Sequence, residues 1–157
     1  MKLTMVGAGR VGSTTLFQLV LEGGIQEFVI VDVRKEVAEG EALDLRHGLA
    51  QSYRTRIVAG DYDATADSDI VVITAGIPRK PGDTRLDLLR TNVELMREIL
   101  DNVVRYSPNA LLFVVSNPVD VLTYQALRQS GFPEQRVFGL GTVLDTTRFR
   151  SLLAERL

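Results

Sequence analysis

Residues 1–12 read M-K-L-T-M-V-G-A-G-R-V-G, in which an apolar run of strand length ends in glycines at positions 7, 9 and 12. Residues 11–22 follow with the apolar spacing of a helix. A strand, a G-x-G-x-x-G turn and a helix in this order are typical of dinucleotide binding. Gly7 permits the tight turn, Gly9 lets a pyrophosphate approach the backbone, and Gly12 lets the helix pack closely on the strand.

Apolar runs of strand length alternate with helical patterns along the rest of the sequence. This alternation predicts an α/β fold, a doubly wound parallel sheet of the Rossmann type with helices on both faces, in a single domain of residues 1–157. The expected strands are residues 2–6, 27–31, 56–59, 69–74, 110–115 and 136–139. The expected helices are residues 11–22, 35–49, 85–106 and 119–130, and a last helix that begins near Asp145.

Asp32 closes the second strand, 20 residues after Gly12. A carboxylate at this position hydrogen-bonds the adenosine ribose hydroxyls and repels a 2′-phosphate, which favours NAD over NADP. The neighbouring basic residues Arg34 and Lys35 keep NADP open as an alternative. Glycine-rich turns between a strand and a helix also bind S-adenosylmethionine in methyltransferases, which is the alternative from another enzyme class.

Two further segments follow expected strands. Small residues in T-A-G, residues 74–76, would let a cofactor lie flat against the backbone, and the turn V-S-N-P, residues 115–118, presents Asn117 to a polar ligand. The loop of residues 77–85 carries three positive charges between prolines and glycines and is interpreted as a lid over an anion. A solvated basic loop is the alternative interpretation.

The segments GAGRVG, VDV, TAGIPRKPGDTR, SNPVD and GTVLDTTRFR occur in one order and together resemble the lactate/malate dehydrogenase family over residues 1–157. The resemblance implies hydride transfer between NAD and a small 2-hydroxy or 2-oxo acid. The resemblance implies cofactor contacts at Gly7, Gly9, Gly12, Asp32, Thr74, Ala75, Gly76, Ser116 and Asn117. We also expect cofactor contacts at the neighbouring residues Arg10, Val11 and Val115.

The resemblance also implies roles on the substrate side. Arg85 would polarise the substrate carbonyl, Arg148 would pair with the substrate carboxylate, and Asn117 would contact the substrate and the nicotinamide ribose of the cofactor. Asp145 would orient a catalytic histidine. Arg79 occupies the lid position at which malate-type enzymes carry arginine, and this favours malate and oxaloacetate, although the neighbouring TRLDLL and GTVLDTTRFR are closer to the lactate branch.

The family's catalytic histidine lies in a G-E-H-G-D-like segment that this sequence does not contain. The single histidine, His47, is expected to have a structural role near the end of the helix of residues 35–49, with Gly48 as the helix stop. We therefore expect the substrate domain to be absent and the chain to bind NAD without catalysis. Asp145 would then cap the last helix and pair with Arg148. A non-catalytic nucleotide-binding or assembly module is the alternative.

Charge and composition narrow the range of partners. The 18 basic and 20 acidic residues give a net charge of −2, which offers no electrostatic case for nucleic acid or an anionic membrane. The sequence has no cysteine and no apolar stretch of about 18 residues, and we expect a cytoplasmic protein without a metal site. Apolar residues of the last helix and of the helix of residues 85–106 predict a homo-oligomer. In the last helix these residues are Phe149, Leu152, Leu153 and Leu157.

Overall fold

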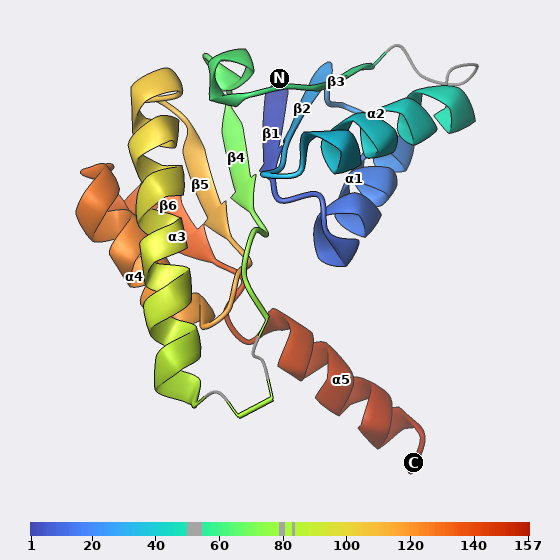
Figure 1. The fold of residues 1–157 in the computed structure, drawn as a ribbon. Helices are drawn as coiled ribbons and strands as arrows, with labels where there is room; N and C mark the ends of the chain where they lie inside the picture. The colour runs from blue at the N-terminus through green and yellow to red at the C-terminus, as the bar shows by residue number, and fades with distance from the viewer. Residues whose placement is uncertain (50–54, 79–80, 83) are drawn as a thin grey trace.

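Parallel strands form one sheet in the computed structural model, which describes residues 1–49, 55–78, 81–82 and 84–157 (Figure 1). The strands of this described part are β1 (Lys2–Val6), β2 (Glu27–Val31), β3 (Arg56–Ala59), β4 (Ile70–Ile73), β5 (Leu111–Val114) and β6 (Val137–Gly139). Their order is β3-β2-β1-β4-β5-β6, so the direction in which the chain adds strands reverses between β1 and β4. In open parallel sheets, ligands bind beyond the carboxyl ends of the strands at such a switch point.

Helices cover both faces of the sheet (Figure 1). On one face lie α1 (Arg10–Glu22) and α2 (Lys35–Leu49), and on the other lie α3 (Arg85–Tyr106) and α4 (Val119–Ser130). Each face has its own apolar core, because successive residues of a strand point to opposite sides. Val71 and Ile73 belong to the core under α3 and α4, whereas Val72 belongs to the core under α1 and α2.

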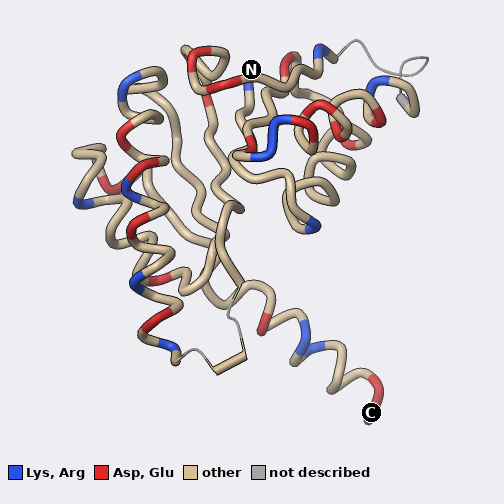
Figure 2. The backbone as a smooth tube through the Cα atoms, in the orientation of Figure 1, with Lys and Arg blue, Asp and Glu red and all other residues tan. Residues whose placement is uncertain are grey.

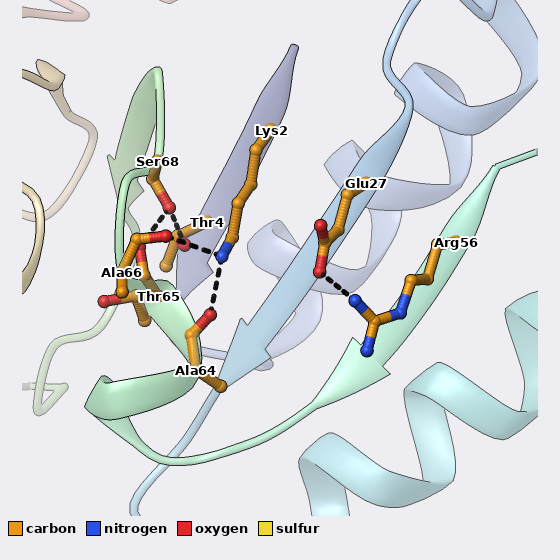
Figure 3. Close-up of polar contacts among 8 residues, drawn as sticks. All are labelled: Lys2, Thr4, Glu27, Arg56, Ala64, Thr65, Ala66 and Ser68. Carbon is orange, nitrogen blue, oxygen red and sulfur yellow. Dashed lines mark hydrogen bonds and ion pairs between the residues drawn. The ribbon is translucent and has the colours of Figure 1, made fainter.

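A polar cluster at the start of β1 holds the segment that leads into β4 (Figure 3). This segment contains the 3₁₀ helix η1 (Tyr62–Thr65). Lys2 Nζ donates to two carbonyl oxygens at the end of η1, at 2.7 and 2.8 Å. The buried Ser68 hydroxyl donates to Thr65 O at 2.6 Å and lies 2.7 Å from the Thr4 hydroxyl. These bonds fix η1 against the sheet.

The predicted fold class is confirmed, and most element boundaries agree within one or two residues. The helix α1 begins at Arg10, and β4 and β5 are shorter at both ends than predicted. The sequence did not reveal η1 or η2 (Glu134–Arg136), because such short turns carry no repeating apolar pattern. As a consequence, β6 begins at Val137, after η2 has ended.

Two predictions about helix ends are wrong. Gly48 does not stop α2, which continues to Leu49. The last helix, α5 (Val143–Ala154), begins after Thr142, so Asp145 lies in its first turn and is not its N-cap. A carboxylate in the first turn still interacts favourably with the positive end of the helix dipole. The predicted ion pair is confirmed, with Arg148 Nη1 at 3.4 Å from Asp145 Oδ1.

The charges of the protein are mixed in sign. Figure 2 shows acidic and basic residues interspersed along α2 and α3. Within the described ranges, no helix is both long enough and apolar enough to cross a membrane.

Candidate functional site

Two glycines where β1 turns into α1 leave no room for a side chain. Gly7 has φ +105°, and a Cβ there would lie 2.5 Å from Ala75 N. A Cβ on Gly12 would lie 2.0 Å from Gly7 O. These glycines therefore have the turn and packing roles predicted from the sequence. Gly9 differs, because no atom lies within 4 Å of its would-be Cβ, and this face of the turn is open to a ligand.

The open side of the turn is also the start of α1. Gly9 is the N-cap residue and has no side chain to cap the first N–H groups of the helix. Arg10 and Val11 form the exposed first turn, in which no acidic residue competes for these groups. The helix dipole adds a partial positive charge here, so the turn suits a phosphate group.

Side chains from the neighbouring strands brace the turn from both sides. Thr74, directly after β4, donates its hydroxyl to Gly7 O at 2.8 Å. Asp32, directly after β2, accepts the Ala8 N–H at 2.8 Å and the Arg34 N–H at 2.9 Å, one with each carboxylate oxygen. The two oxygens of a carboxylate have about four acceptor positions in total. The fixed carboxylate can therefore accept further hydrogen bonds from ribose hydroxyls.

A cleft of about 580 Å³ opens beside the turn, at the carboxyl ends of β1, β2 and β4. A volume of this size is typical of small-molecule and cofactor sites. Of the predicted site residues that the structure describes, six line it, namely Gly7, Gly9, Asp32, Thr74, Ala75 and Gly76. Further lining residues that were not predicted include Asp61, Tyr62, Leu95, Glu98, Ile99 and Asn102.

Arg34 and Lys35, the two basic residues that leave NADP as an alternative cofactor, each lie beside a carboxylate. Lys35 Nζ is 2.5 Å from Asp61 Oδ2, and this carboxylate raises the pKa of Lys35. Arg34 Nε is 3.7 Å from Asp32 Oδ1. The Lys35 and Asp61 side chains are both exposed, so solvent screening keeps their pair weak. The mouth of the cleft nevertheless presents paired charges in place of an uncompensated basic patch.

Tyr62 brings an aromatic ring to the cleft from η1. Burial raises the pKa of its hydroxyl to about 12, and the nearby Glu98 carboxylate adds to the shift. The phenol therefore stays neutral at physiological pH and offers an apolar face. One signal in the sequence could have found it, an aromatic residue shortly after the third strand at the carboxyl edge of the sheet.

The predicted residues after β5 lie next to this cleft in the sheet but do not line it. Val115 is partly buried, and Ser116 donates its hydroxyl to Ala75 O at 2.6 Å. The peptide bond between Asn117 and Pro118 is cis, and Asn117 is exposed. Ser116 therefore connects the end of β5 to the end of β4, while the side chain of Asn117 is accessible.

The predicted substrate residues are not gathered at the cleft. Arg85 is the exposed first residue of α3, while Asp145 and Arg148 are exposed on α5, which projects away from the sheet (Figure 1). His47 is exposed near the end of α2. Arg79 lies outside the described residues. The described residues thus form a cofactor-sized cleft, and Arg85, Asn117 and Arg148 are not among the residues that line it.

Asn92 was also not predicted, although it is almost fully buried and hydrogen-bonds the turns after β4 and β5. A signal for it exists in the sequence. Asn92 lies four residues before Met96, on the face of α3 that enters the core, where an amide is unusual.

Known proteins resemble the chain over nearly its whole length. A family model for the lactate/malate dehydrogenase NAD-binding domain matches residues 1–139. L-lactate dehydrogenase 1 of Clostridium acetobutylicum is 54% identical over 154 residues, which cover 98% of this chain and 49% of that protein. A probable L-lactate dehydrogenase of Schizosaccharomyces pombe is 51% identical over 154 residues, which cover 98% of this chain and 47% of that protein.

Solved structures agree with this result. A minor L-lactate dehydrogenase from Enterococcus mundtii superposes with a TM-score of 0.93 at 43% identity, covering 99% of this chain and 50% of that one. A malate dehydrogenase from Archaeoglobus fulgidus in complex with NADH gives a TM-score of 0.93 at 41% identity, covering 99% and 53%. The chain therefore spans about half the length of the relatives it matches. The methyltransferase alternative has no support.

The contrast between Gly9 and Gly12 leads to a prediction. Gly12→Ala is expected to lower the free energy of unfolding by about 1–3 kcal/mol, because the new methyl group meets backbone atoms that cannot move away cheaply. Gly9→Ala is expected to leave stability within about 0.5 kcal/mol of the parent and to weaken dinucleotide binding. Urea denaturation followed by circular dichroism, together with a calorimetric titration, measures both effects. Equal stability losses in the two variants would contradict the assignment.

Proposed function

The chain belongs to the lactate/malate dehydrogenase family and matches the NAD-binding domain of that family, and we propose that this chain binds NAD(H) for hydride transfer to or from a 2-hydroxy or 2-oxo acid. NAD, when bound, supplies the hydride acceptor, and NADH supplies the donor. The contribution of the chain is to bind and orient this cofactor. The substrate and the reaction are proposals for the protein as a whole, since the chain spans about half the length of its relatives.

The observation that carries the proposal is the pairing of an open phosphate turn with a fixed carboxylate. Gly9 and the start of α1 would hold the pyrophosphate through N–H groups. Asp32, oriented by the Ala8 and Arg34 N–H groups, would accept hydrogen bonds from the adenosine ribose. The other proposed contacts are Gly7, Arg10, Val11, Gly12, Thr74, Ala75, Gly76, Val115, Ser116 and Asn117.

For the substrate side, we propose the roles that the family resemblance implies. Arg148 would bind the substrate carboxylate, Arg85 would stabilise charge on the carbonyl oxygen, and Asn117 would contact both ligands. Asp145, which pairs with Arg148 at 3.4 Å, would orient a histidine that residues 1–157 do not contain. Within these residues, the single histidine is exposed on α2, and we propose that they bind the cofactor without catalysing turnover. A non-catalytic nucleotide-binding module is the second candidate.

Cofactor choice is tested by titrating the chain with NADH and, in parallel, NADPH. We expect NADH to bind at least about 10-fold more tightly, because the Asp32 carboxylate repels a 2′-phosphate. Asp32→Asn removes this charge and is expected to reduce the difference in affinity between NADH and NADPH. Glu36→Gln removes an exposed carboxylate nearby on α2 and serves as the matched control. Failure of the parent chain to bind either cofactor would contradict the proposed function.

Substrate choice can be tested with a chimera of residues 1–157 and the second half of the Clostridium acetobutylicum enzyme, which supplies the remaining half of the relative. Arg79 would pair with a second carboxylate, so we expect oxaloacetate to be preferred over pyruvate. Arg79→Gln is expected to shift the ratio of kcat/KM values by about 10-fold or more towards pyruvate. Residues 1–157 alone, without the proton donor, should turn over at least about 100-fold more slowly than the chimera.

Preference for pyruvate in the chimera with Arg79 would contradict the malate assignment and agree with the names of the curated relatives. Turnover by residues 1–157 at the rate of the chimera would show that a group in this chain replaces the missing proton donor.

We also propose a cytoplasmic homo-oligomer. Apolar side chains on α5 are exposed, with Phe149 at 62% and Leu152 at 61%. Large exposed apolar patches of this kind mark association sites. Sedimentation velocity is expected to give a mass above the 17.3 kDa of one chain, and Phe149→Glu with Leu152→Glu is expected to reduce it. A monomer at high protein concentration would refute the oligomer.

A further inference from the structure

We propose that Asn92 is a positioning residue that fixes the nicotinamide side of the cofactor site by holding the turns after β4 and β5 together. The inference rests on the proposed binding of NAD(H), and it concerns a residue that makes none of the proposed cofactor contacts.

The side chain of Asn92 joins two separate turns from a third element. It is 3% exposed and lies in α3, among the buried residues of the helix. Its Oδ1 accepts the Ile77 N–H at 2.8 Å. Its Nδ2 donates to Ile77 O at 3.1 Å and to Asn117 O at 3.2 Å. One amide thus binds both backbone groups of Ile77 and the carbonyl of Asn117.

This contact lies just where the strand ladder ends. The paired register of β4 and β5 ends at Ile73 and Val114. Beyond it, the Ser116 hydroxyl continues the connection to Ala75 O at 2.6 Å. Asn92 carries the connection further along the chain, to Ile77 on one side and Asn117 on the other, so it sets the separation of the two turns beyond the Ser116 contact.

The chemistry of the contact requires a neutral amide. An asparagine side chain offers an acceptor and two donors, which match one N–H group and two carbonyl oxygens here. The Ile77 N–H fixes which end of the amide is the oxygen. An apolar residue of the same shape would pack at this core-facing position of α3 but would leave three backbone groups without these partners.

The other end of the site is held by different bonds. Asp32 and Thr74 brace the glycine turn, which would bind the pyrophosphate and the adenosine ribose, and neither bonds Asn92. Loss of the Asn92 amide should therefore move Asn117 and the Ile77 turn while leaving the glycine turn in place. A residue that only stabilised the fold would not distinguish the two ends.

The test compares NADH with ADP, which contains the adenosine and pyrophosphate but lacks the nicotinamide side. Asn92→Leu keeps the shape of the side chain and removes all three bonds. We expect it to weaken NADH binding by about 10-fold and to leave ADP binding within about 2-fold of the parent. Gln129→Met is the matched control, because the Gln129 amide likewise crosses between helices, from α4 to Arg97 O at 2.9 Å, but away from the cleft. It should change neither affinity.

A second measurement uses the unmodified protein. Hydrogen exchange at the Ile77 amide is expected to be slow, and NADH, but not ADP, is expected to slow it further. Equal losses of NADH and ADP affinity in Asn92→Leu, or no loss of either, would overturn the positioning role. If this variant does not fold, an Ile77 amide that exchanges freely or responds equally to both ligands would overturn it. A parent chain that binds ADP but not NADH would overturn it as well, and one that binds neither would refute the proposed function itself.

Discussion

The structure depends on the close approach of the β1–α1 turn to the end of β4. A side chain on Gly7 would meet the backbone of Thr74 and Ala75, directly after β4, and one on Gly12 would meet the turn itself. Because neither glycine carries one, α1 can start directly over the switch point between β1 and β4. The positive end of α1 and the open face of Gly9 then meet at the carboxyl edge of the sheet, where a dinucleotide-sized cleft lies.

The carboxyl edge of the sheet is joined across its strands by side chains that bond to a neighbouring turn. Three of these side chains lie just after a strand and one, Asn92, lies within α3, and each binds the backbone of a neighbouring turn. The cofactor site is therefore held by hydrogen bonds that reach beyond the strand ladder. From β2 to β5 these contacts are Asp32 to Ala8, Thr74 to Gly7, Ser116 to Ala75, and Asn92 to Ile77 and Asn117. A site built in this way is organised before the ligand arrives, which lowers the cost of ordering it on binding.

The sequence predicted the sheet, its helices and the glycine turn, because these depend on local patterns and on one spaced motif. Asp32 was found from its position, but its bond to the glycine turn depends on how two strands pair. Tyr62 was missed, because a 3₁₀ turn has no periodic signal. Asn92 was missed, because its role depends on two turns distant in sequence. The errors at Gly48 and Asp145 arose because helix ends depend on local backbone geometry that residue preferences indicate only weakly.

We propose that the glycine turn and Asp32 together bind the dinucleotide. An amide NMR titration of the chain with NADH tests it most directly, since it reports each N–H group separately. We expect the largest shifts at Gly9, Arg10 and Val11 and at the turn after Asp32, with α5 unaffected. Shifts confined to α5 or to the α1–α2 surface, with the glycine turn unchanged at saturating NADH, would contradict it.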